Sequence, residues 1–293
     1  MRFDPDTAVL AADGGGTTCR LALKSGDAVQ AVTLGSANVS TDIARAAETI
    51  RAGLDQLAHE AGVDHATLCA LPAYLGLAGV IGSEDAEGLA HRLPLRRVRI
   101  EDDRCAAVRG ALGAGDGTIA GLGTGSFFGR QTDGAIRLVG GWGSRLGDEA
   151  SGFWIGREAL ARTLDVTDGL RPQTGLSDAI LTRFGGTPRG IVAFSIAATP
   201  GDIAALAPLV ADTAANGDPL GIEILDAGVA YIRRILNAIG WRKGEPICLL
   251  GGATAAYRGR LPEEIVASVK PPRGSALDGA LALAADFREE ARP

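Results

Sequence analysis

Short, largely apolar runs alternate with turn residues in the first third of the chain. Runs at 7–12, 19–24 and 28–34 are separated by turns rich in glycine and aspartate. Runs of this length between turn signals predict neighbouring antiparallel strands. Two more apolar runs, at 71–77 and 98–100, predict further strands.

Helical spacing occurs between and after these runs. Apolar residues at steps of three and four predict a helix over 41–61, with Ser40 or Thr41 as its N-cap. The stretch 106–112 predicts a second helix, which follows an acidic strand end. Strands mixed with helices in this way are typical of α/β layers.

The order of the first elements returns later in the chain. A run at 118–122 leads into the loop 123–126, a second run covers 127–131, and a third covers 135–139 after a tight turn. This order, strand, Gly/Thr loop, strand, turn, strand, predicts two lobes built on one plan. The region 153–239 that follows is mostly helical in pattern.

The end of the chain adds a strand at 247–250 and a helix of small residues at 277–287. A chain of 293 residues is long for one core and suits two compact lobes. We place the hinge between them near 111–117, where the helical pattern gives way to glycines. The sequence therefore predicts an α/β protein with two lobes.

Composition and charge exclude several classes of protein. With 46% apolar and 22% charged residues the chain is globular, and no apolar run approaches the roughly 18 residues of a membrane helix. The net charge is −6, and we interpret the basic stretch 92–99 as a solvent-exposed edge of the protein and not as a nucleic-acid patch. Nucleic acid is therefore not an expected partner. The N-terminus has no basic region leading into an apolar core, so we expect a cytoplasmic protein.

Cysteine and histidine give no metal pattern. The four cysteines are scattered without a C-x-x-C pair, which predicts reduced and mostly buried thiols. His59, His65 and His91 lie in polar sequence and are expected at the surface. Metal binding through cysteine or histidine is therefore not expected.

Glycine is the informative residue. The chain has 42 glycines, about twice the usual share, and they cluster at the ends of apolar runs, where backbone N–H groups can approach a ligand. The familiar phosphate loops do not fit, since no lysine lies in a glycine loop and no G-x-G-x-x-G opens a helix after the first strand. The G-x-S-x-G elbow of hydrolases is absent as well.

Two strand–loop–strand turns, 13–18 and 123–126, are rich in glycine and hydroxyl side chains. Exposed N–H groups in such turns bind anions. One loop alone is more often a simple turn, but two loops, one in each lobe, predict a grip on one polyphosphate from both sides. The carboxylate of Asp13 beside phosphates is consistent with Mg²⁺ between them, held through water.

Two acidic features leave alternatives open. Asp102 and Asp103 end a strand, where they serve either as N-caps of the helix over 106–112 or as the proton acceptor of phosphoryl transfer. The stretch 140–156 alternates glycine, aromatic and acidic residues. This composition favours a sugar pocket over a structural loop with buried tryptophans.

Taken together, these residues resemble the BadF/BadG/BcrA/BcrD ATPase family. Within it, the chain is most similar to the N-acetylglucosamine kinase and glucosamine kinase branch of the actin-like, Hsp70-like and hexokinase-like superfamily. The resemblance runs nearly end to end and implies two actin-like (ribonuclease H-like) lobes, each with a mixed sheet, and a cleft for ATP and sugar between them. The motifs that carry it are Asp13–Thr18, Gly35–Asn38, Leu77–Gly79, Asp103, Gly123–Ser126, Gly140–Gly156, Gly251–Gly252 and Ser275–Ala280.

The resemblance also implies domain limits and residue roles. The N-terminal lobe would comprise 1–114 plus about 277–293, and the C-terminal lobe 115–276. Asp103 is implied as the catalytic base, and Asp13 as the carboxylate on the magnesium side. The other implied contacts are Gly15, Gly16, Thr17, Thr18, Thr124 and Gly125 with the phosphates of ATP, Gly251 and Gly252 with its nucleoside, and Asn38, Gly79, Ser126, Trp142, Gly143 and Asp148 with the sugar.

We therefore expect an ATP-dependent kinase that phosphorylates N-acetylglucosamine or glucosamine at the 6-hydroxyl. Two alternatives stay open: an ATPase that activates a partner enzyme, like the activators of 2-hydroxyacyl-CoA dehydratases, and a non-catalytic sugar or nucleotide sensor. The expected partner is a small amino sugar, with no membrane and no nucleic acid, and related kinases often form homodimers. The sequence does not decide between the acetylated and the free amino sugar.

Overall fold

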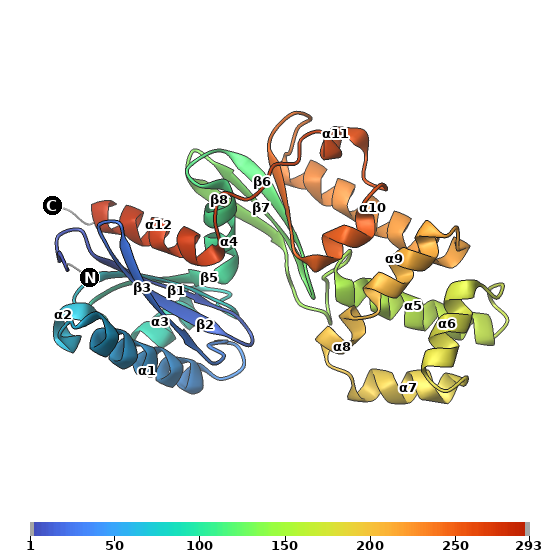
Figure 1. Cartoon of the computed structure of the whole chain (residues 1–293), viewed down its shortest axis with the longest axis horizontal. Helices are drawn as coiled ribbons and strands as arrows, with labels where there is room; N and C mark the ends of the chain where they lie inside the picture. The colour runs from blue at the N-terminus through green and yellow to red at the C-terminus, as the bar shows by residue number, and fades with distance from the viewer. Residues whose placement is uncertain (1–2, 291–293) are drawn as a thin grey trace. The chain divides into compact units, whose positions relative to one another are not determined.

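The computed structural model describes residues 3–290 and divides the chain into two compact units. The first unit comprises Met1–Asp116, Gln131–Ile136 and Pro272–Pro293, and the second comprises Gly117–Arg130 and Arg137–Pro271. The limits that the sequence predicts lie at 114/115 and about 276/277. Figure 1 shows a sheet with helices in each unit.

The first unit is built on a five-stranded mixed sheet of order β3-β2-β1-β4-β5. The pairs β1–β2 and β2–β3 are antiparallel, as the sequence predicts, whereas β4 pairs parallel with both β1 and β5. Carboxyl ends of parallel strands meet at one sheet edge, so β1, β4 and β5 all end at the same edge. The strands are β1 (Val9–Gly14), β2 (Cys19–Ser25), β3 (Ala28–Leu34), β4 (Pro72–Leu77) and β5 (Arg97–Asp102).

Helices cover both faces of this sheet, and the alternation along β1 sorts its side chains between them. Leu10 and Ala12 pack in a core with α1 (Ile43–Ala61), near α2 (His65–Cys69) and α3 (Ser83–Ala90). Val9 and Ala11 pack on the opposite face, in the core that α4 (Asp103–Leu112) and α12 (Ala276–Glu290) complete. The final helix therefore belongs to the first unit (Figure 1).

The long helix α1 begins at Ile43, two residues later than the sequence predicts. Its N-cap is Asp42, whose side chain accepts a hydrogen bond of 3.0 Å from the amide of Arg45. Ser40 is not the cap, because its hydroxyl donates to Asn38 Oδ1 at 2.9 Å. Thr41, the other candidate, is not the cap either, so the prediction of Ser40 or Thr41 as the N-cap was wrong, by two residues and by one residue respectively.

Helices α4 and α12 approach so closely that backbone meets backbone. A Cβ atom at Gly110 would overlap the carbonyl oxygen of Ser275, and one at Gly279 would overlap that of Ala106. Both glycines have ordinary helical backbone angles, so glycine is needed here because it has no side chain and not because of its backbone freedom. This contact fixes α4, whose first residue is Asp103, against the core of the unit.

The second unit has a four-stranded sheet of order β8-β7-β6-β9, in which β9 pairs parallel with β6. The tip of the β7–β8 hairpin belongs to the first unit, where Gln131 donates to the carbonyl oxygens of Gly113 at 2.9 Å and Gly115 at 2.8 Å. The strands are β6 (Gly117–Leu122), β7 (Ser126–Thr132), β8 (Ala135–Gly140) and β9 (Ile247–Leu250).

The mostly helical region that the sequence predicts is confirmed. Its helices share one core with buried sheet residues such as Phe128 and Ile247. The helices are α5 (Gly152–Thr167), α6 (Gly175–Arg183), α7 (Pro188–Ala197), α8 (Pro200–Ala204), α9 (Ala207–Ala215) and α10 (Pro219–Ile239), and beyond β9 come the 3₁₀ helix η1 (Gly252–Tyr257) and α11 (Glu263–Val266).

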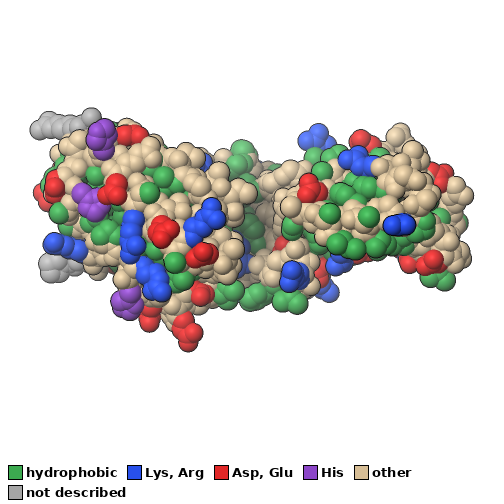
Figure 2. All heavy atoms as spheres, turned by 90° about the horizontal axis from the view of Figure 1, so that it is seen from below, with side chains coloured by type: hydrophobic (Ala, Val, Ile, Leu, Met, Phe, Trp, Pro, Cys, Tyr) green, Lys and Arg blue, Asp and Glu red, His purple; other side chains and the backbone are tan. Residues whose placement is uncertain are grey.

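The structure also tests where the histidine and cysteine side chains were expected to lie. Figure 2 shows histidine side chains, in purple, at the surface of the first unit; His59 and His91 are exposed and His65 is half-buried. The four cysteines are free, and three of them are buried. Within residues 3–290, no helix combines the length and the apolar character needed to cross a bilayer.

The α4–α12 contact generates a stability prediction. We expect Gly110→Ala and Gly279→Ala each to lower the free energy of unfolding by about 1–3 kcal/mol, because the new methyl groups force the helices apart. Gly88→Ala in α3 is the matched control, since its Cβ would meet only the end of the Ile43 side chain, at 3.3 Å. That variant should be as stable as the wild type or more so, because alanine favours helix. Urea unfolding followed by circular dichroism measures this, and equal effects of all three changes would contradict it.

Candidate functional site

The first glycine loop connects β1 to β2 and keeps several backbone donors available. The amide of Gly15 donates to the carbonyl oxygen of Thr18 at 2.8 Å, which closes a tight turn. Within the described part of the chain, the amides of Gly16, Thr17 and Thr18 donate to no protein atom. Gly16, Thr17 and Thr18 are also exposed. Three adjacent free N–H groups at a strand end form the kind of nest that binds an anion.

Asp13 and Asp103 come close together because a glycine lies between their strands. Asp13 on β1 is in register with Gly76 on β4, and Gly76 is in register with Glu101 on β5, two residues before Asp103. A Cβ at Gly76 would already lie 3.1 Å from Ala106 Cβ and 3.4 Å from Asp103 Cα. Even a methyl group at Gly76 would therefore force the start of α4 to shift by a few tenths of an ångström, and a larger side chain would force it further from the sheet.

This placement changes the acidity of Asp103. Burial raises the pKa of its carboxyl group to about 7, and the negative charges of Asp102 and Asp13 add to the shift, against a smaller opposing effect of Arg104. A carboxylate whose pKa is close to neutral is a stronger base than an ordinary aspartate. The group is thus suited to accept a proton.

The structure shows which residue of the Asp102–Asp103 pair is the helix N-cap. Asp102 is the N-cap of α4: it accepts from the amide of Arg104 at 2.9 Å and from Nε of the same arginine at 2.7 Å. Asp103 is the first residue of the helix and is not its cap. One aspartate therefore satisfies the helix, and the other keeps its carboxyl group beside Asp13.

Asp13 has a positively charged neighbour. Its carboxylate is hydrogen-bonded and ion-paired to the guanidinium of Arg20, its register partner on β2. Among residues 3–290 no group of three or more His, Cys, Asp or Glu side chains is arranged to hold a metal ion. Mg²⁺ at a phosphoryl-transfer site needs only one or two carboxylates, because phosphates and water supply its other ligands. Asp13 fits that requirement. In the structure, the cation paired with its carboxylate is the guanidinium of Arg20.

Two of the predicted sugar contacts meet at the end of β4. Gly79 has φ +83°, and a Cβ there would lie 2.5 Å from Asn38 Oδ1 and 2.6 Å from the amide nitrogen of Ser40. The amide of Val39 donates to the carbonyl oxygen of Ala78 at 2.9 Å. Glycine at 79 therefore allows the loop that carries Asn38 to dock on the strand end.

The second glycine loop, in the other unit, is held by the start of α5. The amide of Gly123 donates to the carbonyl oxygen of Gly125 at 2.9 Å, and the amides of Gly152 and Phe153 donate to the carbonyls of Gly123 and Thr124 at 2.8 and 3.2 Å. In the part of the chain that the structure describes, the amides of Thr124 and Gly125 have no protein acceptor. This loop, like the first, keeps N–H groups for a ligand.

The loop 140–151 packs against this turn. Asp148 is 7% exposed and accepts from the amide of Gly143 at 3.3 Å, and a Cβ at Gly125 would lie 2.6 Å from Asp148 Oδ2. The hydroxyl of Ser126 donates to the carbonyl oxygen of Glu149 at 2.7 Å. The structure thus brings together four of the residues predicted to contact sugar or phosphate in the second unit.

The loop 140–151 also carries unusual backbone angles and an exposed ring. Asp148 and Ala150 have φ of +64° and +66°, a backbone conformation that residues other than glycine seldom adopt. Trp142 is 65% exposed, whereas Trp154 is 8% exposed and belongs to the core. The alternative of a structural loop with buried tryptophans therefore fits Trp154 only.

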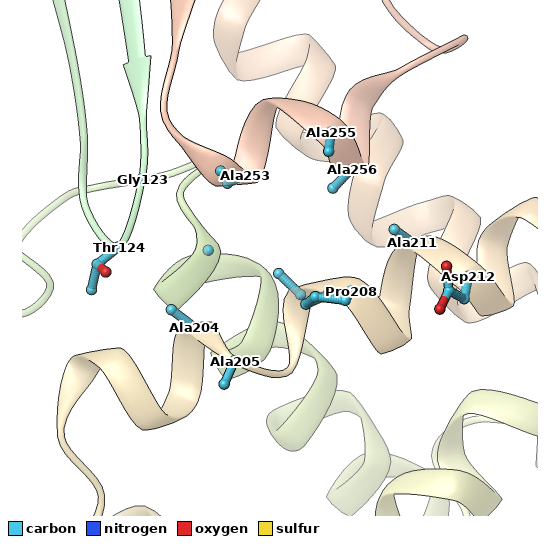
Figure 3. Close-up of a pocket in the computed structure, with 13 residues that line it drawn as sticks. Gly123, Thr124, Ala204, Ala205, Pro208, Ala211, Asp212, Ala253, Ala255 and Ala256 are labelled. Carbon is cyan, nitrogen blue, oxygen red and sulfur yellow. The ribbon is translucent and has the colours of Figure 1, made fainter.

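A pocket of about 480 Å³ lies beside the second glycine loop, within the second unit (Figure 3). Gly251, at the end of β9, has φ +90°, and a Cβ there would lie 2.5 Å from the carbonyl oxygen of Leu122. Glycine at 251 lets the start of η1 come close to the second glycine loop. The pocket is lined by Gly123, Thr124, Gly152, Ala204, Ala205, Ala207, Pro208, Ala211, Asp212, Gly252, Ala253, Ala255 and Ala256.

The predicted site residues thus form one group in each unit. The first group is Asp13, Gly15, Gly16, Thr17, Thr18, Asn38, Gly79 and Asp103, and the second is Thr124, Gly125, Ser126, Trp142, Gly143, Asp148, Gly251 and Gly252. Sequence reasoning missed the pocket wall of α8 and α9. Its only signal is a run of small residues in the helical stretch 204–215, which is equally typical of helix packing.

Comparison with known proteins places the chain among sugar kinases and ATPases. The model of the BadF/BadG/BcrA/BcrD ATPase family matches residues 12–281. A glucosamine kinase of Vibrio cholerae is 30% identical over 275 residues, which are 93% of this chain and 94% of that protein.

Solved structures agree with the family match and with the glucosamine kinase relative. A crystal structure from Chromobacterium violaceum, given the name of an N-acetylglucosamine kinase, has a TM-score of 0.79 and 31% identity and covers 96% of this chain and 100% of that one. A ROK family glucokinase from Streptomyces griseus, at 15% identity, has a TM-score of 0.50 over 97% of this chain and 100% of that one, a likeness in fold. The expected fold class, α/β with two actin-like lobes and a sheet in each, is confirmed.

The raised pKa of Asp103 generates a second stability prediction. Its carboxyl group titrates near 7 in the folded protein against 3.8 for an ordinary aspartate, so the folded state loses stability as the pH rises from about 4 through 7. Asp103→Asn removes this loss. We expect the variant to gain on the wild type over that range by up to about 4 kcal/mol, and to match it below pH 4.

Unfolding curves at pH 4, 6 and 8 measure this difference. Asp27→Asn, an exposed residue of the β2–β3 turn, controls for the loss of one negative charge. A difference between Asp103→Asn and wild type that is the same at all three pH values would show that Asp103 does not have a raised pKa.

Proposed function

Because the chain belongs to the BadF/BadG/BcrA/BcrD ATPase family, we propose that it phosphorylates an amino sugar, glucosamine or N-acetylglucosamine, at the 6-hydroxyl with ATP as the donor. The observation that supports this best is the half-buried Asp103 beside Asp13, in the unit that also holds the first glycine loop. A base of raised pKa near a phosphate-binding turn is what transfer to a hydroxyl requires.

In this proposal Asp103 accepts the proton of the sugar 6-hydroxyl. The oxygen then forms a bond to the γ-phosphorus of ATP, the bond from that phosphorus to the β–γ bridging oxygen breaks, and ADP leaves. The charge that develops on the transferred group is offset by preorganised donors, a role we assign to the free amides of Gly16, Thr17, Thr18, Thr124 and Gly125. Because these amides are fixed by tight turns, they need no reorganisation during the reaction.

The other proposed contacts follow the two groups of residues. Asp13 would hold Mg²⁺ through water, and the ion would neutralise charge on the phosphates. Gly251 and Gly252 would lie at the nucleoside. Asn38, Gly79, Ser126, Trp142, Gly143 and Asp148 would contact the sugar, where the exposed ring of Trp142 offers an apolar face and the buried Asp148 an acceptor for hydroxyl groups.

The direct test is a screen for ADP release in the presence of glucose, glucosamine, N-acetylglucosamine and muramic acid derivatives. We expect release to depend on an amino sugar, with the product carrying phosphate on O6 by ³¹P and ¹H NMR. ADP release that needs no sugar would point instead to an ATPase that activates a partner. Phosphorylation of glucose above both amino sugars would contradict the proposed substrate class.

Asp103→Asn tests the base. The amide keeps the shape of the side chain but cannot accept the proton, so we expect kcat to fall roughly a hundredfold or more while the KM for ATP changes little. In the wild type, kcat/KM for the sugar should fall as the pH drops below about 7, because protonated Asp103 is inactive. The residual activity of the variant should lack that dependence, and near-normal turnover by Asp103→Asn would refute the role.

A further inference from the structure

The pocket beside the second glycine loop has two chemically different ends. Figure 3 shows Thr124 at one end and Asp212 at the other, with Pro208 and Ala253 between them. This inference rests on the proposed function, in which phosphates bind at Thr124 and Gly125. A nucleotide placed with its phosphates there and its nucleoside along the pocket has its base at the Asp212 end.

The wall of the pocket is almost uniformly small and apolar. Of the thirteen lining residues, seven are alanine, one is proline and three are glycine, and none is aromatic. Such a wall holds a base by shape, but methyl groups do not distinguish one hydrogen-bonding edge from another. Besides Thr124 at the phosphate end, Asp212 has the only polar side chain among the lining residues.

Asp212 is available to a ligand. It lies in the last turns of α9, and its backbone carbonyl accepts from the side chain of Asn216 at 2.9 Å. Its carboxylate makes no hydrogen bond or ion pair within the described part of the chain, and the residue is exposed. In Figure 3 the two carboxylate oxygens lie at the end of the row of alanines.

We propose that Asp212 selects adenine, by accepting a hydrogen bond from the 6-amino group of the base. An ionised carboxylate only accepts hydrogen bonds, and the 6-amino group of adenine is a donor. Hypoxanthine presents a carbonyl oxygen at the same place, which a carboxylate repels. Asp212 is thus the specificity-determining residue for the donor nucleotide.

The structure also leaves room beyond the amino group. A second hollow of about 620 Å³ shares four of the pocket's lining residues, Ala211, Asp212, Ala255 and Ala256, and is also lined by Leu225 and Arg258. A small substituent on the amino nitrogen can therefore be accommodated next to Asp212. This makes it possible to remove the hydrogen-bond donor without creating a steric clash.

The experiment compares ATP, N6-methyl-ATP and N6,N6-dimethyl-ATP as donors at saturating sugar, by kcat/KM. The monomethyl analogue keeps one N–H group and the dimethyl analogue keeps none. For the wild type we expect the first two donors to be similar and the dimethyl analogue to be roughly tenfold worse, the usual effect of one hydrogen bond to a charged group. In Asp212→Ala the three donors should be equivalent within about twofold.

Asp168→Asn, an exposed aspartate at the end of α5 outside the pocket, is the matched control and should keep the wild-type order of donors. The proposal is overturned if the wild type uses the dimethyl analogue as well as ATP, if Asp212→Ala keeps the wild-type discrimination, or if GTP is preferred to ATP.

A failure of the proposed function is distinguishable from a failure of this inference. If no sugar is phosphorylated with any donor, calorimetric titration with ADP and N6,N6-dimethyl-ADP still tests the same contact, because binding needs no transfer. Roughly tenfold tighter binding of ADP by the wild type, and its loss in Asp212→Ala, supports the role of Asp212. Equal binding of the two nucleotides by the wild type refutes it.

Discussion

The missing side chain at Gly76 is the constraint on which the proposed chemistry depends. Because β4 offers only backbone at this position, the start of α4 can pack directly on the sheet, and the carboxyl groups of Asp103 and Asp13 come to share one partly buried site. Burial and mutual repulsion disfavour the ionised form of Asp103. The fold thereby makes the carboxylate of Asp103 more basic. Ionisation of this group lowers the stability of the folded state, and the tight α4–α12 packing helps to offset that loss.

The glycine turns of the two units are held in place by different hydrogen bonds. Each has a turn between its first two strands that exposes backbone N–H groups and is closed by a hydrogen bond of its own, Gly15–Thr18 in the first and Gly123–Gly125 in the second. The second turn is in addition held by two amides at the start of α5. The same helix start is adjacent to the loop that carries Asp148. Rigidity at the second turn therefore depends on residues almost thirty positions further along the chain.

Local patterns were sufficient to predict most elements, because strand length, glycine turns and helical spacing are encoded within a few residues. The strands of both sheets and α1 are confirmed, and both glycine loops lie between the strands where the sequence predicts them. The short α2 and α3 were missed, as was η1, since helices of so few residues have little periodicity. Local pattern did not decide which residue of the Asp102–Asp103 pair caps α4, because aspartate is a typical N-cap at either position. The pocket wall with Asp212 could not be predicted, since it depends on contacts between distant segments.

The most direct test of a shared carboxylate site is a titration of the Asp103 carboxyl carbon by ¹³C NMR between pH 4 and 9, with the resonance assigned from Asp103→Asn. We predict a midpoint near 7 that moves down when Asp13 is replaced by asparagine. A midpoint in the range of exposed aspartates, about 4, and unchanged by Asp13→Asn, would contradict the central claim that these two carboxylates share one site.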